Sequence, residues 1–374
     1  MKKLSMLFAA LVMCLTGFNS CKKEKKESAP ASDMLVCSVN RIEGTKTIPL
    51  SELVENCTIV NFEDNDNALF RPWFTTVTDK YIGIRQSGEA GQPYKLFDRT
   101  GKFLCDVGSF GQGPGEYSIA LYDDVIDDEH NMIYLASMVV KKGILVYDTS
   151  GKYVKSILQQ YSFNKPKMFL SGNILSIIHM PFPKDKYFAL QYDITNDKVV
   201  KELPAHASFT VQSYDGEIFR TNNTSAFDFQ HTSSDTLFHY DVLNNKIKPA
   251  FIMGVNTEKK PFRQYIELNN YYITNIWDDS GKGPAITDKK TGQSSTCKIV
   301  NDFYGNMEVP LSVTSFRNGW FVWNLEPPIL REKIEKHLKE NNCSEEDKQK
   351  LQALLSTLPS DDDANNVAFI GKLK

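Results

Sequence analysis

The chain has 374 residues, a formal net charge of −3 at pH 7 and an isoelectric point near 6.1. Its 43 basic and 46 acidic residues form no basic field, which argues against nucleic acid as a partner. The 23 phenylalanines and 16 tyrosines favour short strands and turns over helices.

The chain begins with a targeting segment, predicted over residues 1–20. Lys2 and Lys3 form a basic start, and the apolar run "LSMLFAALVMCLTGF" follows it. Ser20 directly before Cys21 makes the end of this segment resemble a bacterial lipobox, although Phe18 stands where leucine is usual. We therefore predict lipidation of Cys21, with an ordinary signal peptide cut nearby as the alternative.

A polar tether is predicted after the signal, over residues 21–34. It contains "KKEKKESAPASD", which has nothing to bury and suits a solvated linker. A lipid on Cys21 would hold the body, residues 35–374, at a membrane surface without spanning it. The predicted address is the bacterial envelope, at the outer membrane, with the side that the protein faces left open.

A strand–turn–strand pattern recurs five times between residues 94 and 300. The first copy is "YKLFDRTGKFLCDV", and an aspartate closes the first strand of every copy, at intervals of 50, 45, 48 and 47 residues. These turn aspartates are Asp98, Asp148, Asp193, Asp241 and Asp288. Such a period indicates a solenoid or a propeller, and the period-2 alternation of the segments excludes a helical solenoid.

Two further strand-like pieces precede each hairpin, which gives four strands in each unit of about 45 residues, the size of a propeller blade. "FTVQSYDGEIFRTNN" supplies this pair for the fourth unit. Residues 311–325 start a sixth unit, which "LVCSVNR" and "NVAFIGKLK" from the two chain ends would complete and close. The predicted fold is an all-β, six-bladed propeller of four-stranded blades, closed by both termini.

A helical insertion is predicted over residues 327–359. Leu330, Ile334 and Leu338 form one apolar stripe, and a second runs from Leu351 to Leu358 at helical spacing. "SEED", beginning at Ser344, reads as the capping box of the second helix. We expect an αα-hairpin between strands of the last blade, acting as a structural brace or, alternatively, binding a partner.

Several of these segments together carry a family resemblance. They are "LFDRTGKFL" followed by "GSFGQGPGEY", "DDVIDDEHNMIYLASM", "SSDTLFHYD", "NDFYG" and "DDDANNVAFIGKLK". The combination resembles the six-bladed β-propeller lipoproteins of Bacteroidetes-type bacteria, which look like distant relatives of NHL-repeat propellers. The resemblance implies the fold and an envelope address, and it carries over no enzymatic activity.

The glycine-rich segment "GSFGQGPGEY" is not a phosphate loop, because Pro114 removes one N–H and neither GK[ST] nor a helix follows. We expect an inter-blade crossing in which Glu116 caps backbone donors and Tyr117 packs. The alternative is a ligand-facing loop whose contacts are Gln112, Glu116 and Tyr117.

No catalytic, metal or cofactor site is predicted. The six histidines lack metal-ligand spacing, and no GxSxG, HExxH or Cys/His signature is present. The acidic stretches at 123–128 and 360–366 lack EF-hand spacing and are interpreted as solvated turn carboxylates. Five cysteines remain beyond Cys21, which we interpret as small buried side chains with at most one bridge.

Two classes of function remain. The first is a non-enzymatic binding or scaffold protein of the envelope, with a glycan, peptide or protein as partner. The second is a propeller enzyme, a lyase or hydrolase, with its site at the central channel. The strands taken as innermost, "YIGIR", "MIYLA", "ILSII" and "YYITNI", are mostly apolar, which favours the binding protein.

Overall fold

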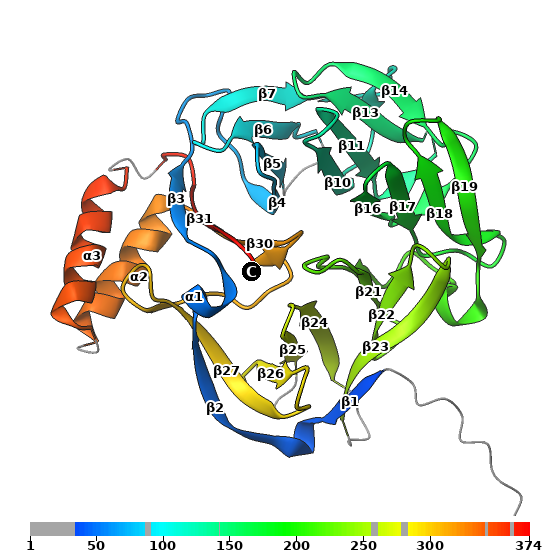
Figure 1. The fold of residues 1–374 in the computed structure, drawn as a ribbon. Helices are drawn as coiled ribbons and strands as arrows, with labels where there is room; N and C mark the ends of the chain where they lie inside the picture. The colour runs from blue at the N-terminus through cyan, green and yellow to red at the C-terminus, as the bar shows by residue number, and fades with distance from the viewer. Residues whose placement is uncertain are drawn as a thin grey trace, which may run out of the picture. The chain divides into compact units, whose positions relative to one another are not determined.

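The structure is a computed structural model that describes residues 34–86, 91–141, 143–255, 261–277, 283–340, 343–359 and 363–374. The predicted signal peptide, Cys21 and most of the tether lie outside the described residues. The described residues form six blades around a central axis, so the predicted six-bladed propeller is confirmed (Figure 1).

The first three blades are four-stranded antiparallel sheets in which strand order follows chain order from the axis outward. Figure 1 shows β4, β10 and β16 nearest the centre and β7, β14 and β19 at the rim. Their strands are β4 (Pro72–Val77), β5 (Tyr81–Gln86), β6 (Tyr94–Asp98) and β7 (Phe103–Val107); β10 (Leu121–Asp127), β11 (Met132–Ser137), β13 (Ile144–Asp148) and β14 (Tyr153–Ile157); and β16 (Lys167–Ser171), β17 (Ile174–Ile178), β18 (Tyr187–Asp193) and β19 (Lys198–Pro204).

The other three blades keep this order and add strands from the N-terminal end of the body. Their own strands are β20 (Ile218–Phe219), β21 (Phe227–His231), β22 (Thr236–Asp241) and β23 (Lys246–Gly254); β24 (Phe262–Glu267), β25 (Tyr271–Trp277), β26 (Ala285–Asp288), β27 (Ser294–Asn301) and β28 (Met307–Glu308); and β29 (Phe316–Arg317), β30 (Trp320–Leu325) and β31 (Val367–Lys372). The added strands are β1 (Leu35–Ser38), β2 (Ile42–Pro49) and β3 (Thr58–Asn61).

The ring is closed by both ends of the body, but not with the predicted N-terminal strand. β3 pairs with β31, with Ile59 opposite Phe369, and completes the sixth blade. "LVCSVNR" forms β1 instead, which lies parallel to β23 as a fifth strand of the fourth blade. Its assignment to the sixth blade was wrong because the chain first covers the outer edges of the fourth and fifth blades, where β2 pairs with β27.

The recurring hairpin joins the third and fourth strands of the first five blades, and its turn aspartates share one role. In each turn the carboxylate accepts backbone N–H groups two to four residues ahead; Asp98, for example, accepts from Thr100 at 2.8 Å and Lys102 at 3.1 Å. Hydrogen bonds to the ionised form lower the pKa of all five carboxyls. Aspartate thus recurs because it closes this turn.

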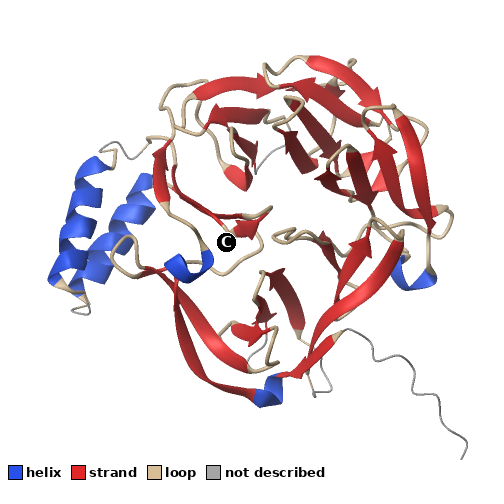
Figure 2. Cartoon of the chain, in the orientation of Figure 1, coloured by secondary structure: helices blue, strands red, loops and turns tan. Residues whose placement is uncertain are grey.

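The helical insertion lies between β30 and β31, as predicted, on the outside of the ring (Figure 2). Its helices are α2 (Pro327–Lys339) and α3 (Glu345–Thr357), and Ser344 caps α3 by accepting the Asp347 N–H at 3.1 Å. Leu330, Ile334 and Leu351 are fully buried in one core cluster with side chains of the fifth and sixth blades. A short third helix, α1 (Leu50–Leu53), precedes β3.

Two sequence assignments within the blades were wrong. "YIGIR" and the three segments grouped with it form the second strand of their blades, not the innermost one. In the fourth blade the second strand is β21, at 227–231, whereas residues 209–217 lie before β20 outside any strand. Two pairs of two-residue strands lie outside the four-stranded sheets. They are β8 (Ser109–Phe110) with β9 (Glu116–Tyr117), and β12 (Val139–Val140) with β15 (Phe163–Asn164).

Candidate ligand-binding site in the channel

A layer of buried charge lies at the axis, on or directly beside the innermost strands and, for Arg85, on the second strand of the first blade. We call Arg85, Asp123, Asp124, Lys167, Arg220 and Arg317 the charge layer. They come from five blades, and each is at most 6 % exposed. Four basic side chains therefore face two carboxylates, and such groups are rarely buried without a partner.

Asp123 is the centre of this layer. Its carboxylate accepts hydrogen bonds from Arg220 Nε at 3.1 Å and Nη2 at 2.9 Å, and from Arg317 Nη2 at 2.6 Å. The Met168 N–H donates to the same group at 2.7 Å. Burial alone would raise the pKa of Asp123, but the two guanidinium groups outweigh it and hold the pKa below its ordinary value. Asp123 therefore stays ionised and joins the second, fourth and sixth blades.

Arg85 is less well paired. Its Nε lies 3.4 Å from Asp124 Oδ1, while the Tyr94 hydroxyl donates to Asp124 Oδ2 at 3.0 Å. Its guanidinium carbon lies 4.3 Å from the ring centroid of Phe74 and 5.3 Å from that of Trp73. Within the described part of the chain, Arg85 Nε, Nη1 and Nη2 have no hydrogen-bond partner. Burial lowers the pKa of Arg85 to about 10, so it remains a cation with unused donors.

Lys167 supplies the fourth basic side chain, from the start of β16. Its Nζ lies 3.7 Å from the ring centroid of Tyr122, a cation–π contact. Burial lowers the pKa of Lys167 well below its ordinary value, although the charge of Asp123 opposes this. The Tyr122 hydroxyl contacts Glu217, which also pairs with Lys165 at 2.8 Å.

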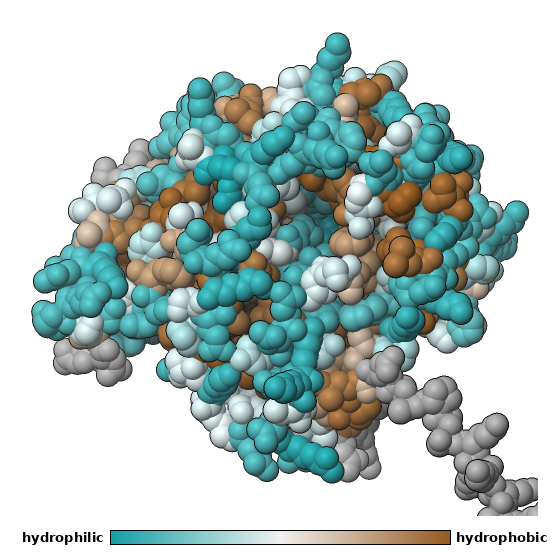
Figure 3. All heavy atoms as spheres, in the orientation of Figure 1, coloured by the Kyte–Doolittle hydropathy of each residue, from teal (hydrophilic) through white to brown (hydrophobic). Residues whose placement is uncertain are grey.

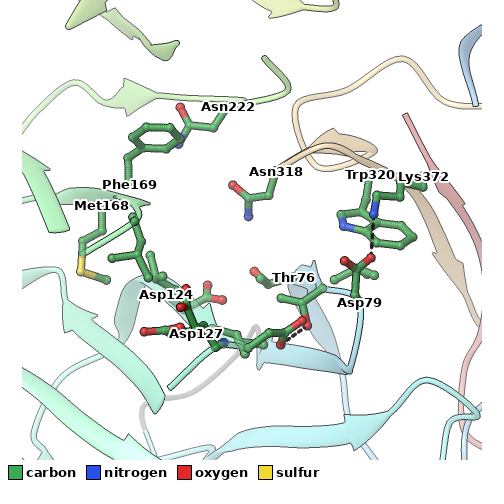
Figure 4. Close-up of a pocket in the computed structure, with 18 residues that line it drawn as sticks. Thr76, Asp79, Asp124, Asp127, Met168, Phe169, Asn222, Asn318, Trp320 and Lys372 are labelled. Atoms are coloured by element: carbon green, nitrogen blue, oxygen red, sulfur yellow. Dashed lines mark hydrogen bonds and ion pairs between the residues drawn. The ribbon is translucent and has the colours of Figure 1, made fainter. Parts of the chain in front are cut away.

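One end of the channel opens into an acidic pocket of about 440 Å³, shown in Figure 4. It lies where β4, β10 and β16 end, and Asp79, Asp124, Asp127, Asp128 and Glu129 are among its lining residues. Figure 3 shows a mostly hydrophilic face that is recessed near the middle of the ring.

Three aspartates of this pocket are held by neighbouring protein groups. Asp79 pairs with Lys372 at 2.8 Å, Asp128 accepts the Thr78 hydroxyl at 2.7 Å, and Asp127 lies 2.8 Å from the His130 ring. Their main contacts therefore close the turns and join the sixth blade to the first.

The side of the ring of blades away from the acidic pocket carries aromatic side chains. We call Trp73, Phe219, Phe262 and Trp277 the aromatic end. Trp73 and Phe262 stand at the starts of β4 and β24, away from the acidic pocket, and Trp277 pairs with Phe262 across β24 and β25. Trp73, Phe262 and Trp277 are 42 %, 41 % and 53 % exposed. The Trp73 ring centroid lies 5.3 Å from the Arg85 guanidinium carbon, so Trp73 borders the charge layer, and Phe262 lies 5.8 Å from Phe219.

The predicted ligand contacts lie elsewhere, in the connection from the first blade to the second. Tyr117 is buried, and its hydroxyl accepts the Tyr94 N–H at 2.9 Å. Glu116 accepts the Gly113 N–H at 2.7 Å, and Gln112 is exposed. The packing of Tyr117 and the capping by Glu116 are those expected of an inter-blade crossing. None of the three residues belongs to the charge layer, and their contact with a ligand stays a prediction.

The prediction that the acidic stretch at 123–128 consists of solvated turn carboxylates was wrong. It runs along β10, and Asp123, Asp124 and Asp127 are 0 %, 1 % and 4 % exposed. Of the second acidic stretch, residues 360–362 lie outside the described residues. Arg220 and Arg317 were missed because the two-residue strands β20 and β29 were not recognised as innermost strands, whereas Arg85 lies on a second strand, β5.

One signal could have revealed the arginines. The dipeptide Phe-Arg occurs at 70–71, 219–220, 262–263 and 316–317, on or beside the innermost strands of the first, fourth, fifth and sixth blades. Arg220 and Arg317 reach Asp123, whereas the Arg263 guanidinium contacts Asp235 and donates to the Met253 carbonyl at 2.6 Å.

The five cysteines within the described residues are free, and no group of three or more metal-ligating side chains occurs there. None of the helices in the described ranges is long and apolar enough to cross a membrane.

Together these features define a six-bladed β-propeller with a charged channel. Residues 36–372 match the family model described as "Domain of unknown function (DUF4934)", and the chain belongs to this family. No curated protein matches the chain.

Solved structures share the fold at low identity. A Bacteroides fragilis protein for which export is predicted is 14 % identical, with a TM-score of 0.60 over 91 % of this chain and all of the other. A DUF4221 member from Bacteroides vulgatus is 10 % identical, with a TM-score of 0.45 over 86 % of this chain and 98 % of that one. At these identities the first likeness shows the fold alone, and the second carries no argument.

Proposed function

We propose that this protein is a non-enzymatic binding protein of the bacterial envelope, whose channel holds its ligand. Its partner is a glycan, a peptide or part of a protein, and a lipid on Cys21 holds it to the membrane, at the outer membrane. The charge layer is the observation that carries the proposal.

The charge layer favours a binding site because buried ions are seldom the most stable way to fill a core. Each ion taken out of water costs several kcal/mol, and hydrophobic side chains of similar volume often serve a core equally well. Here four basic side chains are buried against two carboxylates, and Arg85 has three donors, and Arg317 one, without partners among the described residues. Charges held in this way are typical of functional sites, where a ligand completes the pairing.

The envelope address is supported by the sequence of the first 34 residues and by the structural relative from Bacteroides fragilis, for which export is predicted. A single acyl chain binds a membrane only reversibly, whereas the multiple chains of a lipidated N-terminal cysteine would give stable anchoring. The resemblance to NHL-repeat propellers remains part of this proposal.

The proposal is tested on glycan and peptide arrays with the full chain purified in mild detergent. The matched variant is Lys167→Met, which removes one buried charge and keeps the shape of the side chain. We expect a defined ligand for the wild type and at least a tenfold weaker signal for the variant. A ligand bound equally by both proteins would place the site outside the channel and refute the proposal.

A propeller enzyme is the second candidate, and one observation favours it. Burial lowers the pKa of Lys167, as is usual for a lysine that serves as a general base. Mass spectrometry of the array ligand after prolonged incubation distinguishes the two candidates. An unchanged ligand supports binding, whereas a cleaved ligand, left intact by Lys167→Met, would establish the enzyme.

A further inference from the structure

We infer that the channel binds a ring compound that carries an oxyanion group, which Arg85 holds while the ring lies against Trp73. The inference rests on the proposed function, because it names the class of ligand for the same channel. An oxyanion here means a carboxylate or a phosphate, and the ring is that of a sugar or an aromatic acid.

We infer the charge of the ligand from the charge layer, in which basic side chains outnumber carboxylates. Asp123 accepts short hydrogen bonds from Arg220 and Arg317, although Arg317 Nε has no partner among the described residues. This leaves Arg85 and Lys167 with Asp124 as the remaining carboxylate. Arg85 has its Nη1 and Nη2 donors without partners among the described residues, although the residue is only 1 % exposed. A guanidinium group binds carboxylates and phosphates through two parallel N–H donors. An oxyanion is thus the group that satisfies both free donors at once.

The two ends of the channel differ in a way that sets the direction of approach. The acidic pocket presents carboxylates that would repel an anion, and it is lined on the other sides by Asn222, Asn318 and Lys372 (Figure 4). The aromatic end presents uncharged rings instead. An anionic ligand therefore meets the weaker electrostatic barrier at the aromatic end.

We infer that the ligand contains a ring from the position of Trp73 beside Arg85. This side chain is 42 % exposed, and its ring centroid lies 5.3 Å from the Arg85 guanidinium carbon. A ligand that reaches Arg85 with its charge consequently brings its next atoms beside the indole. Exposed Trp and Phe side chains offer flat surfaces that stack on other rings. Phe262 and Trp277, whose rings lie 5.3 Å apart on the fifth blade, are two further exposed aromatic side chains on this side of the propeller.

Isothermal titration of the full chain in detergent tests the inference with matched ligands. Glucuronate and glucose 6-phosphate are compared with glucose, and benzoate is compared with benzyl alcohol. We expect at least one anion to bind tenfold or more tightly than its neutral counterpart. The sugar and benzoate arms identify the ring, and the two sugar acids identify the oxyanion. If no anion exceeds its neutral counterpart, the inference is overturned.

Two substitutions locate the site. Arg85→Lys keeps the buried charge but loses the paired donors, and Trp73→Ala alters an exposed side chain, so both proteins should fold. We expect each to weaken binding of the anion at least tenfold with a circular dichroism spectrum like that of the wild type. Wild-type affinity in both variants would overturn the inference. An array ligand that carries no anionic group would also overturn it, while leaving the proposed function intact.

Discussion

Asp123→Asn is the substitution whose effect on stability is best determined by the structure. The asparagine has the same shape, but it carries no charge and presents an NH₂ group to donors. Arg220 and Arg317, now held by Asp123 at 2.9 Å and 2.6 Å, would become buried cations without an ion partner. Removing one partner of a buried ion pair costs about 3–5 kcal/mol of unfolding free energy.

This cost converts into a measurable change in melting temperature. An unfolding entropy of about 2.1 cal/mol/K per residue, over about 340 residues, gives about 0.7 kcal/mol/K. We therefore expect Asp123→Asn to lower the melting temperature by about 4–7 °C in differential scanning calorimetry at neutral pH.

The matched control is Asp197→Asn, at a surface site. Asp197 is 62 % exposed and pairs with Lys155 at 3.0 Å, and its φ of 53° is one that asparagine adopts readily. Exposed pairs contribute about 0–1 kcal/mol, so its melting temperature should change by no more than about 1 °C. If the melting temperature of Asp123→Asn also changes by no more than about 1 °C, Asp123 is not the ion partner that stabilises Arg220 and Arg317, and our account of the charge layer is wrong.

Four further predictions concern other parts of the chain. Lys167→Met should melt at the wild-type temperature or higher, because an apolar side chain replaces a buried ion; a fall of more than about 3 °C in calorimetry would contradict this. Leu351→Ala should cost about 2–5 kcal/mol in urea unfolding, since this side chain of α3 is fully buried, whereas half-buried Leu355→Ala should cost less; equal losses would argue against the packing of α3. The turn aspartates have lowered pKa values in the folded state, so their contribution is present above the ordinary value of about 3.9 and is lost as pH falls below it; a melting temperature that stays constant between pH 5 and pH 3 would refute the shared role. A clickable palmitate analogue should label the wild type in cells but not Cys21→Ser, and an unlabelled wild type would disprove the anchor.

The blade pattern was predictable from sequence because it depends on local chemistry. The turn aspartates each satisfy N–H groups within four residues, so the hairpin must carry its own signal wherever it recurs. The helical insertion was equally predictable, because its leucine stripes and the Ser344 cap are signals within single helices.

The charge layer was not predictable in the same way, because it is assembled across blades. Asp123 meets Arg220 and Arg317 at sequence separations of 97 and 194 residues, and no local pattern links them. β20 and β29 have only two residues each, too short for an alternating pattern to identify them as innermost strands. β1 was misplaced for a related reason, since an edge strand gives no sign of which blade it joins.

The most direct test of the binding function is a titration of the array-selected ligand against the wild type and Lys167→Met, with both melting temperatures measured on the same samples. Our account predicts that the variant binds at least tenfold more weakly while it melts within about 3 °C of the wild type or higher. Equal affinities in two equally stable proteins would contradict it, because the buried cations of the channel would then have no part in binding.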